Sequence, residues 1–294
     1  MSDPFLALLP QLLQLIEAAD EPLTLTELSA RSGYSAWHLH RQFRFYCGMP
    51  LQSYQRLLKL QRAATALAYR QTPVTELALD AGYQRAESFT RAFGRWLGQA
   101  PAQFRQQPDW LYWAEHANQL DQIAVTADQT HSAQALAAVR TEQRSRTCLL
   151  QWLHQGHPAS IGNSIRRFIE FRRSNKLHPG RFATFNLLYD DPQDTAAAEY
   201  RFGLALQLNT AQPEFLQSPE LSYVELPAGL YARFDHTGPD AQLESIIRAM
   251  YTELLPARGW IPADVPLLLE RISFFPDVPA HQAQTRIWLA LQTN

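Results

Sequence analysis

Residues 36–46 combine basic and aromatic side chains in a spacing that suits contact with nucleic acid. The positions i, i+3, i+4 and i+7 of this segment are Trp37, His40, Arg41 and Arg44. Arginine can donate two hydrogen bonds to guanine, and tryptophan can pack on a thymine methyl group or a sugar. The other side of the segment is apolar, so the four residues are expected to face outward from a helix. They predict a helix that reads DNA; the alternative is a solvated basic face with a partly buried tryptophan.

A weaker stripe of the same kind lies in residues 86–97. The residues at and around the corresponding positions are Arg85, Glu87, Thr90, Arg91 and Arg95. Arg91 is the candidate for a base or phosphate contact, while Arg85 and Arg95 suit phosphates. Glu87 could accept a hydrogen bond from a cytosine amine, or it could merely be exposed. We expect this segment to hold the DNA backbone more than it reads sequence.

Both stripes belong to a repeated pattern of short helix, glycine turn and second helix. Leu28-x₄-Gly33-Tyr34 returns as Leu77-x₄-Gly82-Tyr83 at an offset of 49 residues, and Leu39, Arg41 and Phe43 return as Phe89, Arg91 and Phe93 at an offset of 50. Core packing explains the repeated apolar positions but not the repeated arginines. The pattern predicts two helix-turn-helix units. Helices are expected over 5–19, 26–32, 36–46, 51–70, 74–81 and 86–97.

The long helix expected over residues 51–70 sets the distance between the two units. Its twenty residues, at about 1.5 Å each, span about 30 Å, and successive major grooves on one face of B-DNA are ~34 Å apart. A rigid helix of this length could place two recognition helices in adjacent grooves. This predicts an asymmetric DNA site about two helical turns long, bound by a monomer.

Charge is distributed unevenly along the chain of 294 residues, whose formal net charge is −2. Residues 22–107 hold eleven Arg and Lys against four acids, a net charge of +7. The other residues hold fifteen basic and twenty-four acidic side chains, a net charge of −9. This asymmetry is typical of a DNA-binding domain joined to a domain with another task.

From residue 146 onward, strand-like runs alternate with helices, and the sequence repeats again. The turn that begins at His154 returns at His236, an offset of 82, and Leu204-Ala205-Leu206-Gln207 returns as Leu289-Ala290-Leu291-Gln292, an offset of 85. The repeat indicates two β-α-β-β modules, and ligands often bind at the seam of such a pair. Strands are expected over 147–153, 183–189, 201–208, 231–236, 267–275 and 285–291, and helices over 160–175 and 241–256.

Together these patterns predict a multidomain fold. An all-α double helix-turn-helix DNA-binding domain over residues 1–107 is followed by a linker over 108–145. The linker is rich in Ala and Gln, has scattered helical character and is expected to include an entry helix or strand. Residues 146–294 are expected to form an α+β domain of two duplicated β-α-β-β modules.

A longer motif runs through the helical part. It comprises Glu76-Leu77-Ala78-x₃-Gly82-Tyr83-x₅-Phe89-x-Arg91-x-Phe93-x₄-Gly98-x₂-Pro101-x₂-Phe104-Arg105, and Trp37-His38-Leu39-x-Arg41-x-Phe43 with Gly48-x-Pro50. Over about residues 5–107 this motif resembles the signature of the AraC/XylS family of transcription regulators. In that family a long helix joins two helix-turn-helix units. The resemblance implies that Trp37, His40, Arg41 and Arg91 occupy DNA-contact positions.

The second half is similar to the GyrI-like effector-binding domain. The similarity rests on the duplicated modules, on Tyr189-Asp190-Asp191-Pro192 and on Glu270 in the penultimate strand. Family members often carry an aromatic residue two positions after that glutamate, where this chain has Ile272. The domain order resembles that of Rob-type regulators. The resemblance implies a groove between the modules that binds amphipathic, often cationic small molecules by means of a carboxylate and aromatic rings.

Glu270 stands in a strand rich in apolar residues, where an unpaired carboxylate is unfavourable. Aligning Pro192 with Pro276 makes Asn186 its counterpart in the first module. The functional interpretation is a counter-charge for a cationic ligand, supported by cation–π contacts. The alternative is a solvent-facing Glu270, or one paired with an arginine at 233, 271 or 286, with the aromatic residues in core packing. The candidate effector-binding residues are Glu270, Asn186, Trp152, Tyr189, Tyr231 and Trp288.

These observations favour a cytoplasmic, DNA-binding transcription regulator. We expect it to be an activator that contacts double-stranded DNA, a small-molecule effector and RNA polymerase. Two alternatives remain for the second half: a surface for a protein partner, or a hydrolase-like enzyme using His154, His157, His236 and Glu270. No nucleophile motif, phosphate loop or metal-ligand spacing supports an enzyme. We therefore expect no catalytic residue, metal or cofactor. No apolar run reaches the ~18 residues that span a bilayer, so no membrane contact is expected.

Overall fold

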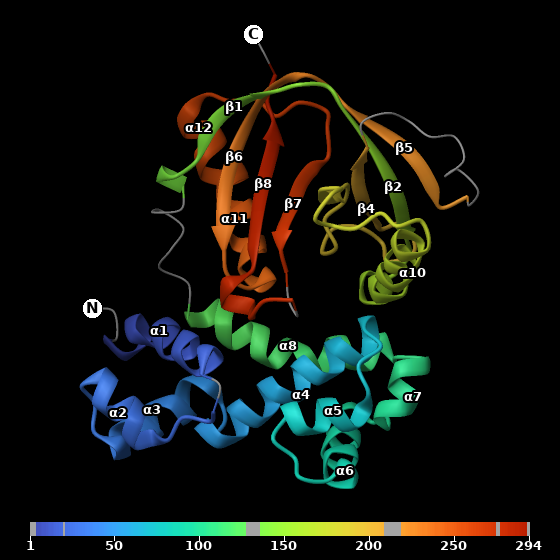
Figure 1. The fold of residues 1–294 in the computed structure, drawn as a ribbon. Helices are drawn as coiled ribbons and strands as arrows, with labels where there is room; N and C mark the ends of the chain where they lie inside the picture. The colour runs from blue at the N-terminus through green and yellow to red at the C-terminus, as the bar shows by residue number, and fades with distance from the viewer. Residues whose placement is uncertain (1–3, 20, 128–135, 209–218, 275–276, 293–294) are drawn as a thin grey trace. The chain divides into compact units, whose positions relative to one another are not determined.

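The computed structural model describes residues 4–19, 21–127, 136–208, 219–274 and 277–292 (Figure 1). The chain forms two compact units, which are Met1–His131 with Pro239–Gln242 and Phe275–His281, and Ser132–Gly238 with Leu243–Phe274 and Gln282–Asn294. The first unit is mainly helical, and the second is built on one antiparallel sheet. The predicted fold class is confirmed. Within the described ranges, no helix is long and apolar enough to cross a lipid bilayer.

The first unit contains both predicted helix-turn-helix pairs, α2 with α3 and α5 with α6. Its helices are α1 (Pro4–Ala18), α2 (Leu25–Ser32), α3 (Ala36–Cys47), α4 (Leu51–Tyr69), α5 (Val74–Asp80), α6 (Ala86–Leu97), α7 (Pro101–Gln106) and α8 (Trp110–Ala127). Gly33 and Gly82, in the two turns, have φ angles of +73° and +83°. A residue with a side chain is strained in that region, which explains why the glycine recurs in the sequence repeat.

Helix α4 contributes to the cores of both helix-turn-helix pairs. Leu51, Tyr54 and Leu58, in its first half, pack with buried residues of α1, α2 and α3. Its second half contributes Leu60 and Leu67 to a core shared with α5, α6 and α7. Because one helix of 19 residues belongs to both cores, the recognition helices α3 and α6 cannot move apart unless α4 bends.

After residue 100 the sequence analysis did not predict α7, and it expected only an entry helix or strand, without bounds, where the structure has α8. Helix α8 lies among the residues expected to form a linker. Trp110 at its start stacks on Tyr69 of α4 with ring centroids 5.9 Å apart, and Leu120 and Ile123 are buried in the first core. Residues 114–119, between the aromatic start of α8 and Leu120, are polar residues and alanines, so this part of the composition resembled a linker. Residues 128–135 of the expected linker lie outside the described ranges.

The second unit has eight strands in one sheet, in the order β1-β6-β8-β7-β3-β4-β2-β5. The strands are β1 (Arg140–Arg144), β2 (Thr147–Gln155), β3 (Thr184–Leu188), β4 (Arg201–Leu208), β5 (Leu221–Leu226), β6 (Gly229–Thr237), β7 (Leu267–Ser273) and β8 (Gln284–Ala290). The helices are α10 (Ile161–Ser174), α11 (Leu243–Ala249) and α12 (Leu255–Arg258), with a π-helical turn Met250–Leu254 between the last two. The sequence did not predict β1 or β5, and residue 275 of the last predicted strand but one lies outside the described ranges.

The strand order shows the duplication directly. Strands β2, β3 and β4 form the first module and β6, β7 and β8 the second, with β3 and β7 paired at the junction. Strand β1 precedes β2 in the chain but pairs with β6, whereas β5 precedes β6 but pairs with β2. Each module therefore receives its edge strand from the segment that leads into the other module.

Alternate strand residues lie on two faces of the sheet, as the pleat requires. On one face, strand residues pack with α10 in the first module and with α11 and α12 in the second. We call the opposite one the inner face. It is defined by the cluster Leu149, Phe185, Tyr231, Leu268 and Trp288, which joins both modules.

The buried position of Trp110 predicts that α8 is part of the first unit's core. Trp110→Ala should lower the free energy of unfolding of this unit by about 3–5 kcal/mol, because it leaves a cavity beside Tyr69. The matched control is Leu111→Ala, since Leu111 is 55% exposed and its truncation should change stability by under ~0.5 kcal/mol. Urea denaturation followed by circular dichroism would measure both. Equal effects of the two substitutions would show that α8 is only an appended helix.

Candidate nucleic-acid interface and effector site

Helix α3 presents the predicted stripe to solvent. Leu39 and Phe43 are buried beneath it, and this fixes which side of the helix faces outward. Trp37 is 70% exposed, and the guanidinium carbon of Arg41 lies 5.9 Å from the centroid of its ring. Arg44 is exposed and His40 is partly buried. The four side chains share one face.

Helix α6 is oriented in the same way by its apolar residues. Phe89, Phe93 and Leu97 are buried, so Arg91 and Arg95 on the other side are exposed. Arg85 and Glu87 are also exposed, and Thr90 is partly buried. The N-cap of α6 is Arg85, whose side chain makes no capping hydrogen bond.

A basic cleft of about 970 Å³ lies between α4 and α6. Its basic residues are Arg56 and Lys59 from α4 and Arg91 and Arg95 from α6. The sequence analysis did not select Arg56 or Lys59. A signal was available, because Gln52, Arg56 and Lys59 follow the i, i+4, i+7 spacing of one helix face and all three line the cleft.

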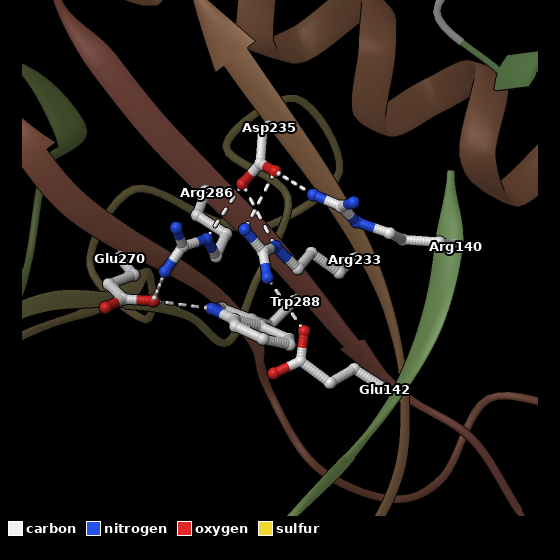
Figure 2. Close-up of polar contacts among 7 residues, drawn as sticks. All are labelled: Arg140, Glu142, Arg233, Asp235, Glu270, Arg286 and Trp288. Atoms are coloured by element: carbon white, nitrogen blue, oxygen red, sulfur yellow. Dashed lines mark hydrogen bonds and ion pairs between the residues drawn. The ribbon is translucent and has the colours of Figure 1, made fainter. Parts of the chain in front are cut away.

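Glu270 of β7 is held by two donors on the neighbouring strand β8 (Figure 2). Its Oε2 atom accepts hydrogen bonds from Trp288 Nε1 at 2.8 Å and from Arg286 Nη1 at 3.1 Å. Its side chain is 16% exposed. Of the alternatives that the sequence left open for Glu270, the structure shows the pair with Arg286.

Asp235 of β6 gathers three guanidiniums beside this pair (Figure 2). It accepts hydrogen bonds from Arg140 at 2.9 Å, from Arg286 at 2.8 Å and from Arg233 at 2.9 and 3.1 Å. Burial alone would raise the pKa of this carboxyl, but the hydrogen bonds from the arginines outweigh it and lower the pKa of Asp235 to about 2. Arg233 also donates to Glu142 at 2.8 Å.

Strand register explains why these charges meet. Asp235 lies directly opposite Arg286 on β8, and Arg286 lies directly opposite Glu270 on β7. Directly opposed residues in antiparallel strands point to the same face. Oppositely charged residues thus form a continuous row across the inner face.

Four of the six predicted effector residues, Glu270, Tyr231, Trp288 and Tyr189, lie on the inner face. Tyr231 and Trp288 are in contact, with ring centroids 6.5 Å apart, and Trp288 donates to Glu270. Tyr189 packs against the same cluster and donates from its hydroxyl to Gln151 Oε1 at 2.7 Å.

The structure does not bring Asn186 or Trp152 to this cluster. Trp152 packs with Phe168 of α10 on the other face. The residue paired with Glu270 across β3 and β7 is Phe185, and Asn186 pairs with Leu269. Asn186 and Glu270 therefore lie on opposite faces of the sheet, so the alignment of Pro192 with Pro276 did not match equivalent strand positions.

The histidines of the enzyme alternative do not converge on Glu270. His154 is buried, and its Nδ1 lies 2.9 Å from the Ser164 hydroxyl of α10. His236 belongs to the second module and alternates with Asp235, so it lies on the other face from the carboxylate row. His157 accepts a hydrogen bond from the N–H of Ala159 in the following turn.

Two family models match the chain. A helix-turn-helix domain matches residues 28–107, and a GyrI-like small molecule binding domain matches residues 149–292. Regulatory protein SoxS of Escherichia coli (strain K12) is 34% identical over 91 residues, which are 31% of this chain and 85% of that protein.

Longer relatives match only in part. Right origin-binding protein of the same organism is 37% identical over 91 residues, which are 31% of this chain and 32% of that protein. The chain thus matches about a third of the length of this relative. Among solved structures, EcmrR in a DNA complex is similar over 92% of this chain and 99% of that chain, at 12% identity and a TM-score of 0.43, which is too low to support an argument.

The lowered pKa of Asp235 predicts how stability depends on pH. The ionised carboxylate is favoured in the folded state, so its contribution is present above pH ~4 and is lost as the pH falls towards 2. At pH 7, Asp235→Asn should lower the free energy of unfolding by about 1 kcal/mol, a value reduced for the partial exposure of the pair. The difference should shrink towards zero in urea denaturation near pH 2. Asp194→Asn, at an exposed aspartate of the same unit, is the control. A difference independent of pH would contradict the ion-pair assignment.

Proposed function

Because the chain belongs to the AraC-type family of transcription regulators and carries a GyrI-like domain, we propose that it is a sequence-specific DNA-binding regulator controlled by a small molecule. The observation that carries the DNA-binding proposal is the pair of exposed stripes on α3 and α6, held by one continuous α4. The 19 residues of α4 span about 28 Å, close to the ~34 Å between adjacent major grooves. A single chain could therefore occupy two grooves on one face of the duplex.

The two stripes would divide the work of recognition. Trp37, Arg41 and Arg44 on α3 supply groups that distinguish base edges, and His40 can donate to a base or a phosphate. On α6, Arg91 suits a base or phosphate contact, with Arg85, Glu87, Thr90 and Arg95 around it. The basic cleft between α4 and α6 adds Arg56 and Lys59, which suit the phosphates that cross between the two grooves.

The second unit would bind the effector on its inner face. Glu270, Tyr231 and Trp288 lie together there, and Tyr189 packs at the same cluster. Aromatic rings beside a carboxylate favour an amphipathic cation. The relatives named as regulators support a role in transcription, and we propose an activator that contacts RNA polymerase as a monomer.

A protein partner is the second candidate for this unit. The exposed side chain of Ile272, 49% accessible on β7, is the observation that favours it, because this is the position where relatives often have an aromatic ring in the effector site. An apolar residue that faces solvent at the sheet surface suits a protein contact.

The DNA-binding proposal predicts different losses at α3 and α4. With an operator selected from a random duplex library by the wild type, Arg41→Ala should weaken specific binding by ~1–3 kcal/mol and relax one base position. Lys59→Ala should weaken specific and non-specific binding alike and reduce the salt dependence by about one charge. Fluorescence anisotropy at several salt concentrations would measure both, with Arg173→Ala on α10 as the control. An equal loss of specific and non-specific affinity in Arg41→Ala would make Arg41 a phosphate contact.

The effector proposal predicts a charge-selective response of the full chain. Hydrophobic cations should raise the melting temperature of the wild type more than anions or neutral amphiphiles of the same size, because bound ligand stabilises the folded state. Glu270→Gln should reduce this shift. Differential scanning fluorimetry, followed by anisotropy with the selected operator, would measure binding and its effect on DNA. A chain that responds to none of these ligands would leave the protein-partner candidate.

A further inference from the structure

Arg144, the last residue of β1, lies among three aromatic rings of the inner face. Its guanidinium carbon is 4.1 Å from the centroid of the Trp288 ring and 5.7 Å from the centroids of Phe185 and Tyr231. Proteins use several aromatic faces around one cation to bind organic cations. We call Phe185, Tyr231 and Trp288 the aromatic cage; its centre holds a cation supplied by the chain itself.

The Arg144 guanidinium is partly buried in the cage, but the contacts that hold it there are weak. The Nη1 atom is buried and has no hydrogen-bond partner among the described residues. Burial lowers the pKa of Arg144, and the nearby Glu270 carboxylate opposes that effect. Stacking and a long-range attraction thus hold the side chain, and moving it into water would restore its lost hydrogen bonds.

The neighbouring carboxylates already have other partners. Glu270 accepts from Arg286 and Trp288, and Asp235 accepts from Arg140, Arg233 and Arg286. Glu142 accepts from Arg233. If Arg144 left, every one of these carboxylates would keep a hydrogen-bonded arginine, so the row across the sheet would persist.

The first module shows what the fold itself requires at this position. With the offset of 82 residues that relates β2 to β6, Arg144 on β1 corresponds to Leu226 on β5. Leu226 is 1% exposed and packs into the inner face. A leucine therefore satisfies the packing at the equivalent place, and a charge in the cage is not needed to build the sheet.

We propose that Arg144 is an internal cation that occupies the aromatic cage, and that an organic cation with a planar charged group on an apolar body binds this domain by taking its place. An amidinium or a substituted guanidinium has that chemistry. Arg144 then determines which cations can bind the site and how high a ligand concentration is needed to displace it. This inference rests on the proposed effector role of the second unit and names the ligand class of that site.

An anion that pairs with Arg144 is the competing interpretation, and the surroundings disfavour it. The faces of aromatic rings carry negative charge and repel anions. The Glu270 carboxylate, whose charge acts on Arg144, would repel an anion as well. A cation that replaces the guanidinium meets the same rings and the same carboxylate that Arg144 meets.

Three small probes of one shape test the proposal: benzamidinium, neutral benzamide and the anion benzoate. Arg144→Ala in the full chain empties the cage, so benzamidinium should bind this variant about tenfold more tightly than it binds the wild type. Benzamide and benzoate should not show this gain. Arg146→Ala is the matched control, because Arg146 is exposed two residues further on and pairs with Glu225 outside the cage. Isothermal titration calorimetry would give the affinities.

A second variant guards against misfolding. Arg144→Leu copies the first module and should fold like the wild type, with a cage that is partly filled, so its gain for benzamidinium should be smaller than that of Arg144→Ala. Adding Glu270→Gln to Arg144→Ala should remove much of the gain. Equal benzamidinium affinities in the wild type and Arg144→Ala, or benzoate binding that disappears in Arg144→Ala, would overturn the proposal.

The experiment also separates this inference from the proposed function. If benzamidinium binds Arg144→Ala but no amphiphile changes DNA binding by any variant, the cage is established and the regulatory role fails. If amphiphiles change DNA binding by the wild type while Arg144→Ala gains nothing for benzamidinium, the regulatory role stands and the inference about Arg144 is wrong.

Discussion

The rigidity of helix α4 is the constraint on which the DNA-binding unit depends. One helix supplies residues to both cores, so α3 and α6 are each held in a fixed position relative to α4. Its second half is lined by the small buried side chains of Ala63, Ala64 and Ala66, which let α5 and α7 approach closely. The exposed side of the same helix carries Arg56 and Lys59. The length of α4 thus sets the distance between the two helix-turn-helix pairs, its buried side packs into both cores, and its exposed side carries basic residues.

In the second unit, the alternation of side chains along each strand is the constraint that positions the candidate site. It sends apolar residues to the helices and gathers aromatic and charged residues on the inner face. Register then decides which charges meet, as in the row from Asp235 through Arg286 to Glu270. A shift of one residue in β6, β7 or β8 would therefore move one of these charges to the opposite face of the sheet.

The sequence predicted those parts whose signals are local. Glycines, prolines and the apolar period placed α2 to α6 within one or two residues, and alternation located six of the eight strands. Strand β1 was not predicted because Arg140–Arg144 contains no apolar residue; only its pairing with β6, far along the chain, makes it a strand. Helix α8 was expected only as an entry helix or strand without bounds, because polar residues and alanines occupy 114–119 within it. Arg144 could not be selected from sequence, since its role depends on rings contributed by β3, β6 and β8.

The exchange of edge strands has a consequence for how the duplicated domain comes into existence. Strand β1 cannot complete its pairing until β6, about ninety residues later, has left the ribosome. Until then β1 would expose unpaired backbone groups. Neither half of the duplicated domain contains every strand of its own part of the sheet. A half expressed by itself should therefore expose an unpaired edge and be prone to aggregation.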